Sequence, residues 1–78
     1  MLFNNDFTIE LDDIPETAED ICFAVAKYCA ENSLTYEFES RSSPVIVRID
    51  SRRYEVTKKF AKRHWINLWV LRCKEIKG

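Results

Sequence analysis

The sequence predicts a single small α+β domain over residues 1–78, in which one helix packs on a mostly antiparallel sheet of four to five strands. Only one segment has the periodicity of a helix, whereas the others alternate apolar and polar residues as strands do. The strands after the helix are separated by links of a few residues, and such links join antiparallel neighbours. One helix covers one face of such a sheet, so we expect two layers in the order β-α-β-β-β-β.

The helix has a clear start, a clear apolar face and a clear end. Thr17 is a good N-cap, and Asp20, three residues later, can return a hydrogen bond as in a capping box. An apolar stripe at helical spacing follows, formed by Ile21, Ala24, Val25, Tyr28 and Cys29. We expect Asn32 and Ser33 to end the helix, with Asn32 tolerating the left-handed conformation. Phe23 points away from the stripe and forms a second, smaller apolar patch that can pack against a terminus or a second subunit.

Five segments alternate with a period of two and are expected to be strands, with short turns between them. The strands are residues 7–12, 34–39, 45–50, 53–60 and 65–76, and the turns after the helix are residues 41–44, 50–52 and 61–64. Residues 54–63 also fit a short helix, because Val56, Phe60 and Arg63 have helical spacing.

The last strand is apolar on both sides through its middle. Leu71 and Cys73 are expected to face the helix, because their neighbours Arg72 and Lys74 would be costly to bury. Ile66, Leu68 and Val70 then lie on the face that the helix does not cover, with Ile46 near them. Exposed apolar residues on one strand mark an association site, so these four residues are our predicted partner interface. A bulge that switches the phase of the strand is the alternative.

The charges divide between the two halves of the chain, although the formal net charge is −1. Residues 1–40 hold ten acidic residues and one lysine, whereas residues 41–78 hold eleven basic residues and three acidic ones. Such a division fits two halves that face each other within one chain or across a dimer, and it also fits a basic surface for an anionic partner. We favour the intramolecular interpretation, with Glu37 and Glu39 on the same sheet face as Arg48.

The basic half contains a candidate nucleic-acid surface. Bases interleaved with aromatic rings suit single-stranded nucleic acid, because cations follow the phosphates and rings stack on the bases. The candidate contact residues are Lys58, Lys59, Lys62, Arg63 and Trp65. The competing interpretation is that the lysines form a solvated face while the aromatic residues fill the core.

No catalytic, metal or cofactor site is expected, so we predict that the protein is not an enzyme. His64 has no carboxylate near it in sequence, and the one glycine is terminal, which excludes glycine-rich phosphate loops. Asp12 and Asp13 are interpreted as charge near the helix start. Three cysteines without an export signal or a membrane span indicate reduced, buried thiols in a cytoplasmic protein.

The run FTIELDDIPETAEDICFAVAKYC over residues 7–29, together with RYEV at residues 53–56 and LRCKEI at residues 71–76, resembles a family of small bacterial domains of unknown function. The resemblance covers nearly the whole chain. It implies a free-standing, bacterial, cytosolic domain, and it transfers no functional residue because the family has no assigned activity.

Two functions from different classes remain. The first is a non-enzymatic protein-interaction module that associates with itself, as a homodimer, through the uncovered sheet face. The second is a domain that binds single-stranded nucleic acid through its basic and aromatic C-terminal half.

Overall fold

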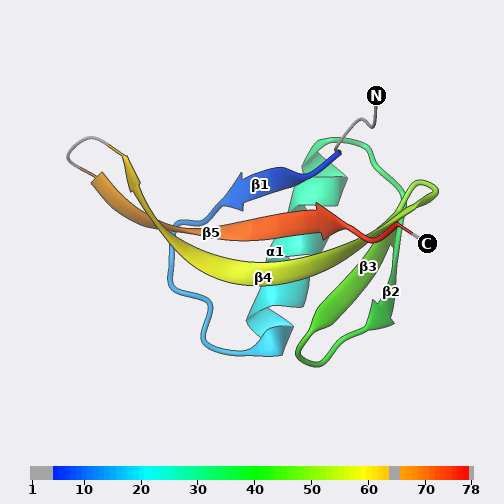
Figure 1. Cartoon of the computed structure of the whole chain (residues 1–78), viewed down its shortest axis with the longest axis horizontal. Helices are drawn as coiled ribbons and strands as arrows, with labels where there is room; N and C mark the ends of the chain where they lie inside the picture. Colours follow the sequence, from blue (N-terminus) through cyan, green and yellow to red (C-terminus); the bar gives the residue numbers. More distant parts are fainter. Residues whose placement is uncertain (1–4, 64–65, 78) are drawn as a thin grey trace.

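The chain folds into two layers, and the predicted α+β class and order of elements are confirmed (Figure 1). The computed structural model describes residues 5–63 and 66–77. One helix, α1 (Ala18–Glu31), packs on one face of a five-stranded antiparallel sheet. The strands are β1 (Phe7–Glu10), β2 (Tyr36–Ser40), β3 (Val45–Ile49), β4 (Arg52–Arg63) and β5 (Ile66–Glu75). We call the sheet face turned away from α1 the reverse face.

Helix α1 begins as the sequence predicts. The Asp20 N–H donates to Thr17 Oγ1 over 3.1 Å, and the Thr17 N–H donates to the Asp20 carboxylate over 3.2 Å, which completes the capping box. The other end differs in detail, because Asn32 has a φ of −106° and it is Ser33 that is left-handed, with a φ of 55°. Asn32 contributes through its side chain instead, donating from Nδ2 to the Tyr28 carbonyl over 2.8 Å. In the described part of the chain, no helix is long and apolar enough to cross a membrane.

The sheet has the strand order β1-β5-β4-β3-β2, so the first strand lies beside the last one (Figure 1). Phe7 pairs with Cys73 and Ile9 with Leu71, and these contacts join segments more than sixty residues apart in sequence. The remaining strands are neighbours in sequence and in space. Strands β1 and β2 are therefore the two edges of the sheet, and α1 connects one edge to the other.

Residues 54–63 are strand, so the alternative of a short helix there is wrong. The expected turn over residues 61–64 is also wrong for its first three residues, because β4 continues to Arg63 and pairs with β5 up to Arg63↔Ile66. Because no glycine or proline interrupts residues 54–63, nothing in the stretch ends the strand before Arg63. His64 and Trp65 lie outside the described residues.

Short turns join β2, β3 and β4 where the sequence predicts them. The turn between β2 and β3 contains a cis Ser43–Pro44 peptide bond. In the turn between β3 and β4, Asp50 is left-handed with a φ of 57°, a conformation that Asp tolerates better than most residues. Its N–H donates to the Thr35 carbonyl over 2.9 Å, and its carboxylate accepts a 3.0 Å hydrogen bond from Thr35 Oγ1. These two hydrogen bonds stabilise the left-handed conformation of Asp50.

The core lies between α1 and the sheet. Val25 and Cys29 of the helix and Leu71 and Cys73 of β5 are fully buried in it, so the prediction that Leu71 and Cys73 face the helix is confirmed. Since side chains alternate along a strand, Leu68 and Val70 fall on the reverse face. This alternation positions the candidate interaction site described next.

Candidate interaction site

The β4–β5 hairpin extends beyond the strands on either side of it (Figure 1). Strand β3 pairs with β4 only as far as Val56, and the last bond from the β1 side is the Leu11 N–H to the Trp69 carbonyl, 3.0 Å. We call the extension, residues 58–63 and 66–69, the arm. A two-stranded ribbon is marginally stable by itself, and unpaired strand edges readily accept a partner. The arm is thus the part of the described sheet best suited to association.

The reverse side of the arm carries part of the predicted apolar surface. Ile66 is 64% exposed and Leu68 is half-buried. Val70 is only 4% exposed, so the expectation that it offers an exposed apolar surface is wrong. At Val70 the sheet is three strands wide, with Glu10 of β1 and Lys59 of β4 as its cross-strand neighbours. Val70 is covered because neighbouring strands place side chains on both sides of it, whereas Ile66 has a neighbouring strand on one side only and stays exposed.

Ile46 shares the reverse face but lies far from the arm, so the expectation that it sits near Leu68 is wrong. It pairs with Glu55 of β4, which in turn pairs with Lys74. Leu68 pairs with Ala61, six residues further along β4, and six residues of strand span about 20 Å. The strand order and the stagger of β3 against β5 separate the two residues.

The helix-facing side of the arm carries an aromatic pair. The rings of Phe60 and Trp69 meet edge to face with centroids 5.4 Å apart, and Phe60 is exposed. Lys58 Nζ lies 5.9 Å from the Trp69 ring centroid and donates a 3.2 Å hydrogen bond to the Pro15 carbonyl. Lys58 therefore ties the base of the arm to the loop that precedes α1.

The predicted nucleic-acid residues do not converge on one surface. By alternation along β4, Lys58 and Lys62 share the side of Phe60, whereas Lys59 lies on the reverse side. Lys59 and Lys62 are exposed, and Lys58 is exposed although its ammonium binds Pro15. The Arg63 side chain and Trp65 lie outside what the structure describes.

Part of the charge division is neutralised across the sheet, in line with the intramolecular interpretation. Arg48 Nη2 lies 3.0 Å from Glu37 Oε1, and Arg53 Nε lies 2.8 Å from Glu39 Oε1. Both pairs join the acidic half to the basic half at the β2 edge. They are partly exposed, and such pairs contribute roughly 0–1 kcal/mol each. The lysines of the arm are not involved in them.

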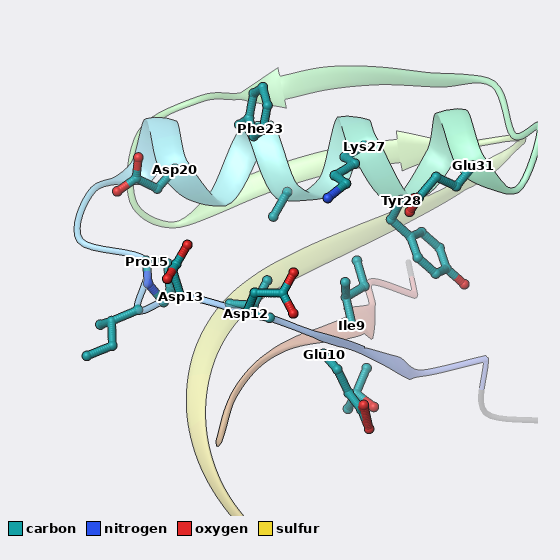
Figure 2. Close-up of a pocket in the computed structure, with 14 residues that line it drawn as sticks. Ile9, Glu10, Asp12, Asp13, Pro15, Asp20, Phe23, Lys27, Tyr28 and Glu31 are labelled. Carbon is teal, nitrogen blue, oxygen red and sulfur yellow. The ribbon is translucent and has the colours of Figure 1, made fainter. Parts of the chain in front are cut away.

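An open groove of about 570 Å³ lies between β1 and α1 (Figure 2). Two of its lining residues are large apolar side chains left in solvent: Ile14, 58% exposed, and Phe23, 73% exposed. Asp12 and Asp13 line it from the loop after β1, and Lys27 reaches into it from α1. The sequence indicated the exposed Phe23 but not the groove, because nothing local places β1 beside this side of the helix.

The three cysteine thiols of the described residues are not activated, and these residues include no metal-ligand cluster. Burial raises the pKa of the Cys22 and Cys29 thiols, and it raises the pKa of Cys73 to about 12, with the neighbouring Cys29 as a second cause. All three are free and buried, so they stay protonated near neutral pH and pack as small apolar side chains. Within residues 5–63 and 66–77, no group of three His, Cys, Asp or Glu side chains is placed to hold a metal ion.

Comparison with known proteins does not assign the chain to a family. No protein-family model matches it, and no curated protein and no solved structure matches it significantly. The resemblance to a family of small bacterial domains therefore stays a prediction.

Proposed function

We propose that this protein is a non-enzymatic interaction module that forms a homodimer through the arm of the β4–β5 hairpin. The observation that carries the proposal is that the arm extends past β1 and β3 while bearing apolar side chains in solvent. Within residues 60–63 and 66–68 of the arm, neither strand edge is paired with a third strand. A second chain that covers the arm would remove apolar surface from water and complete the pairing.

The reverse side of the arm is the more apolar contact surface. Ile66 is largely exposed, and Leu68 is half-buried beside Ala61 on the paired strand. Burial of apolar side chains contributes about 25 cal/mol per Å² of area removed from water, so one or two such residues per chain can anchor a weak dimer. Two of the four residues expected at the interface, Ile66 and Leu68, thus remain in the proposal.

A charged residue on the reverse side of the arm should abolish association. We expect the wild-type chain to sediment as a dimer at micromolar concentrations, and Ile66→Glu and Leu68→Glu to sediment as monomers, because a buried unpaired carboxylate is costly. Analytical ultracentrifugation over a concentration series measures the dissociation constant. The circular dichroism spectrum of each variant checks that it is folded.

The matched control is Ile46→Glu, which makes the same change on the same sheet face about 20 Å from Leu68. It should leave the dimer intact. A wild-type chain that stays monomeric at every concentration would contradict the proposal, and so would a dimer that tolerates both arm variants.

Single-stranded nucleic-acid binding is the second candidate, supported by the exposed Phe60 ring beside Trp69 with Lys62 on the same side of the arm. Fluorescence anisotropy with a labelled oligonucleotide should show binding that falls steeply with salt, since phosphate contacts release counterions. Phe60→Ala should weaken it about tenfold through lost stacking, whereas Tyr36→Ala, an exposed aromatic on β2, should not. Absence of binding at low salt would remove this candidate.

We propose a cytoplasmic location for the module, and the resemblance noted in the sequence suggests a bacterial one. The three thiols are free and buried, as expected for a protein kept in a reducing compartment. Fractionation of the source cells tests this placement, and an exported chain would contradict it.

A further inference from the structure

The groove between β1 and α1 combines apolar and acidic groups that face solvent. Ile14 and Phe23 are two of the five large apolar residues exposed in the described part of the chain. Asp12 and Asp13 are also exposed, and neither makes an ion pair or hydrogen bond within the described residues. Figure 2 shows Asp12 and Asp13 on the strand side of the opening, with Phe23 on the helix side. A basic segment that also carries apolar side chains would complement this surface.

The arm has that complementary chemistry. Phe60 and Ile66 are two more of the five exposed large apolar residues. Lys59 is exposed on the same reverse side as Ile66 and, like the groove aspartates, has no ion-pair partner within the described residues. Four of the five exposed large apolar side chains therefore lie on the arm or in the groove, two regions of opposite charge, and the fifth, Tyr36, lies on β2 at the far edge of the sheet.

We propose that the groove between β1 and α1 receives the arm of a second copy of this chain, with the reverse side of the arm, and Lys59 on it, facing Asp12 and Asp13. This inference rests on the proposed function and names the surface that the arm binds. Each copy carries one arm and one groove, so a two-fold dimer in which each arm enters the other copy's groove satisfies both surfaces. The same contact brings Asp12 and Asp13 of the acidic half against Lys59 of the basic half, in line with the charge division of the sequence.

Charge reversal on each surface, followed by mixing, tests the pairing. The groove variant Asp12→Lys/Asp13→Lys and the arm variant Lys59→Glu should each dimerise at least about tenfold more weakly than wild type, because like charges then face each other. An equimolar mixture of the two variants should recover the wild-type dissociation constant as a 1:1 dimer, since both of its junctions pair opposite charges. Sedimentation velocity measures the dissociation constants of the groove variant, the arm variant and their mixture, and a fluorescent label on one variant identifies the mixed dimer.

The control is Glu37→Lys/Glu39→Lys, which changes the net charge by as much as the groove variant does. It lies on β2 at the opposite edge of the sheet and should leave dimerisation unchanged. If Ile66→Glu breaks the dimer but groove reversal does not, the proposed function stands and the groove is not the docking site. If the wild-type chain is monomeric, both fail. A mixture that does not associate, or that forms assemblies larger than a dimer, would overturn the reciprocal pairing.

Discussion

Leu71→Ala should lower the free energy of unfolding by about 2.7–5 kcal/mol, the range for truncating a buried leucine to alanine when the surrounding core closes the cavity only partly. Leu71 is 0% exposed and is the largest of the fully buried side chains. It lies in the middle of β5 between β1 and β4, pairing with Ile9 on one side and Lys58 on the other. A cavity there loses contacts with both layers. A chain of 78 residues has about 4–12 kcal/mol of stability in total, so the loss takes a large part of it.

Urea denaturation followed by circular dichroism measures the effect in a dilute sample. Leu68→Ala is the matched control, because it makes the same change three residues earlier on the reverse face, where the side chain is only half-buried. We expect it to cost about 1 kcal/mol. Equal losses at the two positions would contradict the placement of α1 on the Leu71 side of the sheet.

Stability should fall as the pH rises from about 9 to 12, because burial raises the pKa of Cys73 to about 12 from an ordinary value of 9.0. Below pH 9 the thiol is protonated in both the folded and the unfolded chain, so it makes no difference there. Between the two values the unfolded chain releases the proton and the folded chain keeps it, which favours unfolding. The difference of about three pKa units lowers the free energy of unfolding by about 4 kcal/mol at pH 12.

The raised pKa values of Cys29 and Tyr54, both caused first by burial, act in the same direction. Comparison with Cys73→Ala isolates the contribution of Cys73. The variant should be less stable than wild type at pH 7, since it leaves a small cavity, but its stability should fall less steeply between pH 9 and 12. Urea midpoints across this pH range are the measurement, and parallel slopes for the two proteins would show that Cys73 does not titrate as expected.

Most of the secondary structure could be predicted because its causes are local. The capping box between Thr17 and Asp20 and the stripe that follows it are set by residues three and four apart, so the helix start and its buried face were confirmed. Leu71 and Cys73 were placed correctly because Arg72 between them cannot be buried cheaply. Residues 54–63 kept two assignments from sequence, a strand and a short helix as its alternative, since the spacing of Val56, Phe60 and Arg63 also suits a helix.

The candidate site was predicted only in part, because exposure depends on how many strands flank a residue. Ile66 and Val70 have similar sequence contexts on the same strand, yet one is exposed and the other is buried where β1 joins the sheet. Ile46 was grouped with them because the stagger between β3 and β5 is not encoded in either strand alone. The groove beside Phe23 had no sequence signal beyond one phenylalanine on the polar side of the helix.

By itself, the sequence determined that this chain has one helix and several strands, where most of them begin and end, and which residues of the last strand turn toward the helix. These features follow from contacts between residues a few positions apart. Only the tertiary structure decided that β1 lies beside β5, how far the arm extends past its neighbours, and that an acidic groove opens between β1 and α1. Pairing of segments such as residues 7 and 73 depends on the packing of the whole chain, and no local periodicity records it.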